Sequence, residues 1–215
     1  MEITYLGHSS FKLRGKTVTV VTDPFDTIAV GIKFPKHTSA DIVTVSHDHN
    51  DHNATNTVEG SPFVVSGPGE YEVKGVGIVG IGVFHDDANG AKRGKNTIYR
   101  IELDGVSIVH LGDLGHTLTS DQVDGLDGVD ILLIPVGGVY TIDAKIAREV
   151  VTAIEPSVVI PMHYHSFDLD QKAFGSLAAV SVFLKEIGKE NIPLVPKFSV
   201  TKDTLPEELQ VVVLQ

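Results

Sequence analysis

The sequence predicts a layered protein of mixed α+β and α/β class, in which sheets pack against each other and helices cover the outside. Three observations favour this fold class. Apolar runs of four to eight residues recur along most of the 215-residue chain, and each is ended by Gly, Pro, Asp or His. Helical spacing is clear in only two segments. Many strands come first and helices are interleaved later, a pattern typical of stacked sheets with outer helices.

The expected strands are short apolar runs bounded by turn residues, which favour the pleated and buried backbone of a sheet. In chain order they are Ile3–Leu6, Thr17–Thr22, Asp41–Val45, Pro62–Ser66, Val76–Phe84, Thr97–Leu103, Val106–Leu111, Val129–Pro135, Ser157–Ile160 and Leu209–Leu214. No linker, repeat or low-complexity segment interrupts the series. We therefore expect a single domain over residues 1–215.

The two helical patterns cover Asp143–Ile154 and Asp168–Ile187, where apolar residues recur on one face. A shorter helix is expected to start near Asp51. The segment 25–38 is expected to be a loop, and its apolar residues include Ile28 and Phe34. This apolar cluster is interpreted as a substrate lid or an oligomer contact, and the sequence does not separate the two.

Composition excludes several classes of partner. The formal net charge is -11 and the pI about 5.2, so the overall field repels phosphate backbones and anionic membranes, and nucleic acid is a poor partner. The chain has no Cys, so metal ligands must be nitrogen or oxygen atoms. No leader pattern or membrane-length apolar run is found, and we expect a cytoplasmic protein.

The segment His47-Asp48-His49-Asn50-Asp51-His52 predicts a metal site, because three imidazoles and a carboxylate fall in the spacing His-x-His-x-Asp-His. Two His at i and i+2 on extended backbone point to the same side. The Asp-His pair that follows can face a second ion as the chain turns. One short motif can therefore serve two metals.

Further candidate ligands stand at the ends of predicted strands, where a rigid sheet edge can hold side chains from distant parts of the sequence. These residues are Asp23, His47, His85, Asp113 and His163. A Ser nucleophile is not indicated, because the chain has no Gly-x-Ser-x-Gly elbow.

With these motifs the chain resembles the metallo-β-lactamase superfamily, and specifically its compact branch of Zn-dependent hydrolases that includes ascorbate-6-phosphate lactonase-like proteins. The resemblance covers nearly the whole chain. It rests on Leu6–Phe11, Thr22–Phe25, His47–His52, Gly67–Tyr71, His85–Asp87, Arg93–Asn96, Leu111–Asp113 and Pro161–Tyr164.

The resemblance implies a four-layered αβ/βα sandwich with a dinuclear metal site between its two sheets. It further implies that one metal is held by three histidines, the other by a carboxylate and two histidines, and that a second carboxylate bridges them. In that order the ligands are His47, His49 and His85; Asp51, His52 and His163; and Asp113.

Zn²⁺ is the expected ion at both positions, although Mn²⁺ and Fe²⁺ also suit imidazole and carboxylate ligands. His85 in place of an acidic ligand argues against the di-iron relatives. The hypothesis is hydrolysis of a small ester or lactone by a metal-bridging hydroxide, with Asp51 or Asp113 as the catalytic proton carrier.

Residues around this centre carry weaker predictions. Asp23 is expected to orient a metal-bound His or a water, and the alternative is a structural cap of the Asp-Pro turn. His8 and His116 are expected to line the pocket or to be structural histidines. His110 is expected to be a hydrogen-bonded core residue, whereas His37 and His165 are expected at the surface, with a weaker prediction that His165 lines the pocket.

Two residues are candidates for substrate contact. Arg93 can clamp a carboxylate or phosphate, and the alternative is an ion pair with Asp86 or Asp87. Tyr140 follows a predicted strand end and can reach substrate; the alternative is that this segment only caps the next helix through Thr141 or Asp143.

Three alternatives stay open beside the small-molecule hydrolase. A phosphodiesterase or nuclease would use the same metals, but this short acidic chain has no room for the extra arms of RNA-cutting relatives. A metal-binding protein without turnover is the second, and β-lactam hydrolysis the third. A homo-oligomer is also allowed. The substrate is not chosen by the resemblance, because pocket loops vary on a shared fold.

Overall fold

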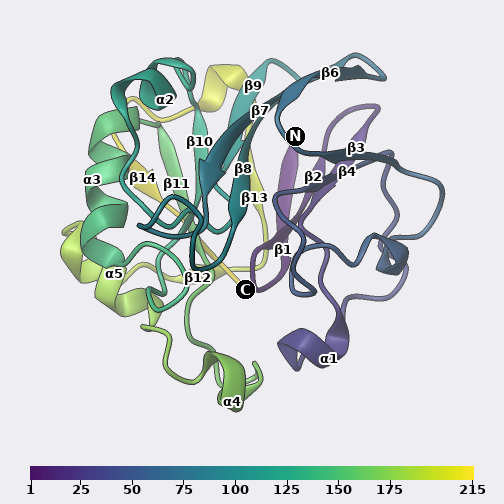
Figure 1. Ribbon diagram of the computed structural model, residues 1–215. Coiled ribbons are helices and arrows are strands. Elements are labelled where there is room, and N and C mark those ends of the chain that lie inside the picture. The colour runs from purple at the N-terminus through teal and green to yellow at the C-terminus, as the bar shows by residue number, and fades with distance from the viewer.

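The computed structural model describes residues 1–215 and contains two large sheets that face each other (Figure 1). The first sheet has the strand order β13-β1-β2-β3-β4-β5 and the second β14-β11-β10-β9-β8-β7-β6. The strands of the first sheet are β1 (Glu2–Gly7), β2 (Ser10–Arg14), β3 (Thr19–Thr22), β4 (Ile42–Val45), β5 (Phe63–Ser66) and β13 (Phe198–Ser199).

The second sheet comprises β6 (Gly69–Val73), β7 (Val76–Phe84), β8 (Lys95–Leu103), β9 (Val106–His110), β10 (Ile131–Pro135), β11 (Val158–Met162) and β14 (Gln210–Val211). A small third sheet pairs β12 (Leu194–Val195) with β15 (Val213–Leu214). The helices are α1 (Thr27–Val30), α2 (Ser120–Asp124), α3 (Ala144–Ile154), α4 (Gln171–Phe174) and α5 (Val180–Glu186), with 3-10 turns at Thr55–Thr57 and Lys202–Thr204.

Parallel pairing brings the ends of several strands to one edge. In the first sheet β3, β4 and β5 run parallel, and in the second sheet β9, β10, β11 and β14 do so. The carboxyl ends of parallel strands share an edge of the sheet. The residues that follow β3, β4, β9 and β11 are therefore held on rigid backbone.

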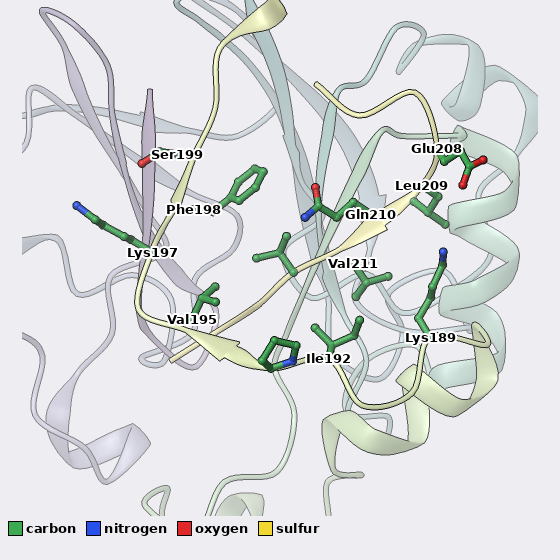
Figure 2. Close-up of a pocket in the computed structure, with 12 residues that line it drawn as sticks. Lys189, Ile192, Val195, Lys197, Phe198, Ser199, Glu208, Leu209, Gln210 and Val211 are labelled. Carbon is green, nitrogen blue, oxygen red and sulfur yellow. The ribbon is translucent and has the colours of Figure 1, made fainter. Parts of the chain in front are cut away.

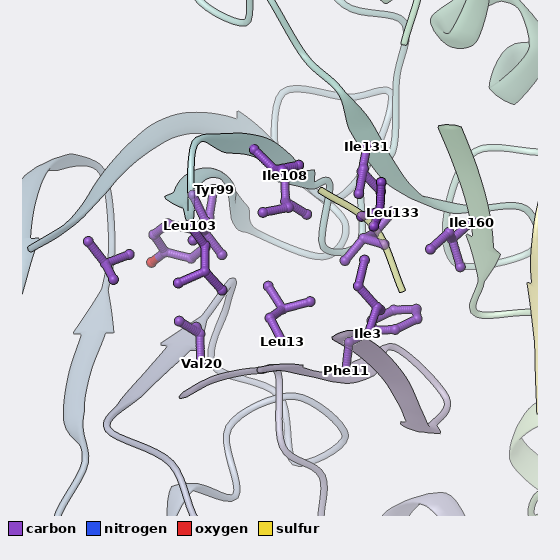
Figure 3. Close-up of a cluster of buried hydrophobic side chains, with 14 of the residues drawn as sticks. Ile3, Phe11, Leu13, Val20, Tyr99, Leu103, Ile108, Ile131, Leu133 and Ile160 are labelled. Atoms are coloured by element: carbon purple, nitrogen blue, oxygen red, sulfur yellow. The ribbon is translucent and has the colours of Figure 1, made fainter. Parts of the chain in front are cut away.

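Three buried apolar clusters hold the layers together. A cluster of 22 residues lies between the two sheets, where Phe11 and Leu13 of the first sheet face Ile108 and Leu133 of the second (Figure 3). A cluster of 20 residues packs the second sheet against α3 and α5, and one of 11 residues covers the outer face of the first sheet. These layers confirm the predicted sandwich.

The predicted helix Asp168–Ile187 is wrong as one element, because the structure divides it into α4 and α5. Residues 175–179 between them are not helical. Phe174 of α4 packs into the cluster on the first sheet, whereas Phe183 of α5 packs into the cluster on the second. A single straight helix could not deliver both rings, so the break follows from packing demands in two layers.

The helix expected near Asp51 is also wrong. The backbone amides of His52 and Asn53 both donate to the carbonyl of His49, which closes one turn and no more. The next element is the 3-10 turn at Thr55–Thr57.

Only β7 has the predicted bounds, and the other predicted strands differ from the structure by one or two residues at one or both ends. The structure also divides Leu209–Leu214 into β14 and β15, which belong to different sheets. The sequence did not predict β2, β6, β12 or β13.

The segment 25–38 packs inward. Phe25 and Phe34 lie in the cluster that covers the first sheet, and the segment contains the short helix α1. Ile28 projects with 87% of its surface exposed. The apolar cluster is therefore mostly a cover for the sheet, and neither a free lid nor an oligomer contact is needed to explain it.

No helix has the length and apolar character required to cross a bilayer.

Candidate metal centre

Two groups of potential ligands lie at the ends of the strands. In the first, ligand atoms of His47, His49 and His85 lie within 4.8 Å of one another. The second group has the same spacing and combines His8, Asp51, His52 and His163. The structure thus brings together the side chains that the sequence had placed in these two groups, and it adds His8.

Asp113 lies between the two groups. Its Oδ2 atom is 3.3 Å from Nε2 of His85, 3.3 Å from Nε2 of His163 and 4.0 Å from Nε2 of His47. Its Oδ1 atom is 3.3 Å from Nε2 of His52. One carboxylate therefore reaches imidazoles of both groups, which is the position that a bridging ligand requires.

The backbone at these positions adopts uncommon conformations. His8, Asp23 and His163 have positive φ angles of 55°, 41° and 51°. For residues other than glycine such backbone costs roughly 1–2 kcal/mol each. The carbonyl of His8 accepts from the Tyr5 hydroxyl at 2.8 Å and from the His163 amide at 2.9 Å, which fixes two of these turns to each other.

Asp23 and Ser46 orient the imidazoles from behind. The Asp23 carboxylate accepts from Ser46 N at 2.8 Å and from His52 Nδ1 at 2.7 Å. The Ser46 hydroxyl contacts Asp23 Oδ2 at 2.5 Å and Nδ1 of His47 at 2.9 Å. Because the Nδ1 atoms are occupied, the Nε2 atoms of both histidines face the centre. Asp23 touches the far side of the His52 ring and is placed as an orienting residue.

Burial and charge shift the pKa values of the centre. Burial and the neighbouring His52 lower the pKa of His47 to about 3, and burial with His163 nearby lowers the pKa of His8 to about 4. Burial would lower the pKa of His52 as well, but Asp113, Asp51 and Asp23 raise it well above its usual value.

The neighbouring imidazoles lower the pKa values of the two carboxylates. Burial opposes ionisation of Asp113, yet His163 and His52 hold its pKa well below the usual value. Asp51 is lowered in the same way, with His52 and His8 outweighing burial in their effect on its pKa. Both carboxylates are therefore ionised near neutral pH, as ligands of a cation must be.

Asp86 organises the loop that follows His85. Its side chain accepts from the backbone amides of Ala88, Gly90, Lys92 and Arg93 at 2.7–2.9 Å. Burial opposes ionisation, but these four amides lower the pKa of Asp86 to about 2.

The alternative of an ion pair between Arg93 and Asp86 or Asp87 is wrong. The Arg93 guanidinium donates to the Val139 carbonyl at 3.0 Å and lies 5.6 Å from the centre of the Tyr140 ring. Asp87 pairs with Lys92 at 2.8 Å.

The remaining candidates occupy structural positions. The Tyr140 hydroxyl donates to the Ala173 carbonyl at 2.8 Å, so only its ring faces His163, at 6.5 Å between centroids. His116 accepts from the Phe84 amide at 3.2 Å and belongs to neither ligand group. Asp143 caps α3, as the alternative for that segment expected.

The three other histidines follow their predictions in part. His110 is fully buried and contacts the Ser9 carbonyl through Nε2 at 2.8 Å, as expected of a core residue. His37 is exposed and pairs with Glu59, whereas His165 is half-buried against Gln171.

Sequence reasoning missed Ser46, Asp86 and Asn96. Asn96 donates to the Leu111 carbonyl at 2.9 Å and accepts from the Asp113 amide at 3.1 Å, so it sets the turn that carries Asp113. Adjacency was one signal for two of them, since Ser46 precedes His47 and Asp86 follows His85 in the chain.

One cavity in the structure contains candidate ligands, and another does not. The first, of about 440 Å³, contains His47 and His49 together with three charged residues, Asp48, Arg93 and Lys95. Another of about 530 Å³ lies at the C-terminal segment, between Lys189 and Lys197 (Figure 2). No histidine lines that second cavity, which places it outside the candidate centre.

The fold and the clustered histidines together define a metal-dependent hydrolase of the metallo-β-lactamase superfamily. The family model described as "Beta-lactamase superfamily domain" matches residues 2–163. The chain is 32% identical to the UPF0173 metal-dependent hydrolase of Thermoplasma acidophilum, over 88% of this chain and 97% of that one. A relative of the same name from Thermococcus onnurineus is 31% identical, over 78% and 86% of the two chains. The chain thus belongs to the UPF0173 family of metal-dependent hydrolases within this superfamily.

Solved structures agree with this assignment. A candidate Zn-dependent hydrolase of the metallo-β-lactamase superfamily from Thermotoga maritima has a TM-score of 0.81 and 39% identity, with 99% of this chain and 97% of that one covered. An isothiocyanate hydrolase from Delia radicum gut bacteria shares the fold alone, at a TM-score of 0.68 and 12% identity over 94% and 99% of the chains.

Proposed function

We propose that the chain is a two-metal hydrolase of a small ester or lactone, with Zn²⁺ as the expected ion at both positions. The observation that carries the proposal is the 3.3 Å spacing between Asp113 and imidazole nitrogens of both groups. Two ligands that each lie 2.0–2.1 Å from a tetrahedral ion are about 3.3–3.4 Å apart. The spacing thus suits atoms that share an ion.

Unpartnered polar atoms support the same proposal. Nε2 of His47, Nε2 of His52 and Oδ1 of Asp113 are buried and make no hydrogen bond. A buried polar atom without a partner costs about 1–3 kcal/mol, so such atoms are rare unless a ligand satisfies them. Three of them converging on one centre fit a bound cation.

The residues present would hold the ions in the two groups given above, with Asp113 between them. Two bound divalent ions supply Lewis-acid polarisation of the scissile group and lower the pKa of a water from about 15.7 towards 7. Mn²⁺ and Fe²⁺ suit the same nitrogen and oxygen donors. The likeness to ascorbate-6-phosphate lactonase-like proteins stays a prediction.

The two carboxylates differ in their suitability for moving protons. The Asp51 side chain is 20% exposed, whereas that of Asp113 is 2% exposed. His8 and His52 both contact Oδ2 of Asp51, at 3.2 and 3.6 Å, and no hydrogen bond engages its Oδ1. We therefore assign proton transfer to Asp51, because only this carboxylate can exchange a proton with solvent, and a positioning role to Asp113.

The test is hydrolysis by Zn²⁺- and Mn²⁺-loaded protein of a panel of lactones, thioesters, phosphodiesters and a β-lactam. Bound metal per chain is measured in parallel. His49→Ala is the test variant, and His37→Ala is the matched control because His37 is exposed and outside both groups.

Turnover of a lactone or ester that is lost in His49→Ala and kept in His37→Ala supports the proposal. Turnover of the phosphodiester alone would replace it with the nuclease class. Two bound ions without turnover of any substrate would favour a binding protein, and a chain that binds no metal would overturn the proposal entirely.

A further inference from the structure

We infer that Arg93 and Lys95 form an oxyanion subsite beside the metal centre, so that the substrate carries a carboxylate or phosphate group near the bond that is cleaved. The inference rests on the proposed hydrolase function and names the chemistry of its substrate. Four observations on the loop after His85 carry it.

The first observation is that the backbone of Arg93 is fixed. Asp86 accepts the Arg93 amide at 2.7 Å and three further amides of the same loop. The Gly94 amide donates to the Gly90 carbonyl at 2.9 Å, and the His85 amide donates to the Gly94 carbonyl at 3.0 Å. The loop is therefore anchored directly to His85, and the backbone of Arg93 is tied to a candidate ligand.

The second observation is the place of the guanidinium. Arg93 lines the cavity of about 440 Å³ that also contains His47 and His49, and it lines a second cavity of about 420 Å³ in which its guanidinium contacts Val139 and Tyr140. Its guanidinium reaches the Val139 carbonyl and the Tyr140 ring, and that ring lies 6.5 Å from the ring of His163. Arg93 thus extends from the wall beside the first ligand group to the loop beside the second.

The third observation is that no carboxylate neutralises Arg93. Of the acids around it, Asp86 is occupied by backbone amides, Asp87 by Lys92, and Asp143 by the α3 amide that it caps. Asp48, which lines the same cavity, accepts from the side-chain amide of Asn53 at 2.6 Å and forms no ion pair with Arg93, although its negative charge offsets part of the positive charge there. The positive charge is therefore held in place by a carbonyl and an aromatic ring, neither of which cancels it.

The fourth observation is unused donor capacity. A guanidinium has five N–H donors, and the structure assigns one of them to the Val139 carbonyl. The remaining donors suit two parallel bonds to a carboxylate or phosphate. Lys95, exposed and without an ion pair, adds a second cation to the same cavity. Arg93 and Lys95 outnumber the single carboxylate of Asp48 in this cavity, and this excess of positive charge favours an anionic group.

The first arm of the test measures anion binding to the metal-free protein, with inorganic phosphate and acetate as separate probes and calorimetry as the readout. Arg93→Gln should weaken binding of the better probe at least about 10-fold, because charge-assisted bonds to arginine are lost. Arg14→Gln is the matched control, since Arg14 is exposed at the end of β2. Thermal melting establishes that each variant is folded.

Unchanged phosphate and acetate affinities in folded Arg93→Gln would overturn the subsite, as would the absence of measurable binding in the parent protein. The probe that binds more tightly tells a phosphate-bearing substrate from a carboxylate-bearing one.

The second arm compares a lactone that bears a carboxylate with its neutral analogue on the Zn²⁺-loaded protein. Arg93→Gln should raise KM for the charged lactone about 10-fold and leave KM for the neutral one unchanged. An equal effect on both lactones would contradict the subsite. If neither lactone is hydrolysed but the calorimetric difference persists, the proposed function fails while the subsite stands.

Discussion

Replacing Asp23 by Asn tests whether a residue that hydrogen-bonds to a candidate ligand, His52, sets the metal affinity of the centre. The Asp23 carboxylate accepts from His52 Nδ1 at 2.7 Å, and this bond presents the lone pair of Nε2 to the centre. An amide NH₂ at the same place would face Nδ1 and favour the imidazole tautomer with hydrogen on Nε2. A protonated Nε2 cannot bind a metal ion.

The expected magnitude follows from these contacts. Loss of an orienting partner usually lowers metal affinity about 10–100-fold, which corresponds to about 1.4–2.7 kcal/mol. Asp23 is fully buried and also accepts from the Ser46 amide, so the unfolding free energy of the metal-free protein should fall by about 1.5–3 kcal/mol.

The assay is competition for Zn²⁺ against a chromophoric chelator, with stoichiometry and affinity fitted separately for the two ions. Asp41→Asn is the control, because it also removes one carboxylate charge. Asp41 precedes β4, outside the candidate centre, and contacts Thr19 and Lys74. We expect Asp23→Asn, but not Asp41→Asn, to weaken binding of the ion at the group that contains His52. Parental affinity for both ions in Asp23→Asn would refute the reasoning.

Removal of the metal by a chelator should abolish hydrolysis and lower the Tm, and re-addition of the metal should restore both. The Tm should change because a ligand at 1,000 times its Kd contributes about 4 kcal/mol to stability. A Tm that does not respond to metal would contradict this. Asp113→Asn should weaken both ions, since Asp113 reaches both ligand groups, and calorimetry showing loss of only one ion would argue against a bridging position. Because the pKa of His8 is lowered to about 4 and that of His47 to about 3, the unfolded chain binds protons that the folded chain does not. The unfolding free energy of the metal-free protein should therefore fall as the pH is lowered from about 6.5 to 4, despite the opposing raised pKa of His52, and a flat profile in urea titrations would be inconsistent with it.

The layered fold was predictable because its strands are buried on both faces and read as continuous apolar runs. Val158–Met162 and Ile131–Pro135 are buried at every position, which separates them from the amphipathic pattern of α3. The division of Asp168–Ile187 was not predictable. Helical spacing runs through the break at Gly175, and the two halves are needed because Phe174 and Phe183 enter different clusters.

The candidate ligands could be identified because chemistry and strand ends coincide in the sequence at His47, His85 and His163. The surrounding contacts could not. His8 meets Asp51 across 43 positions of sequence, and no local pattern indicates that pairing. The loop closed by Asp86 has a partial signal, a carboxylate ahead of a Gly-containing turn, but its four amide partners depend on the folded backbone.

The position of β13 has a consequence for how the chain folds during synthesis. β1 lies at the edge of the first sheet until Glu2 pairs with Ser199, and the last strands then tie β11 of the second sheet to β14. At roughly 5–20 residues per second, the ribosome needs on the order of ten seconds or more to deliver that partner. Throughout this interval β1 presents unpaired backbone groups to other nascent chains. All seven metal ligands that the sequence predicted, and His8 with them, lie before residue 164, so the centre can begin to assemble while the sheet beside it is still open to aggregation.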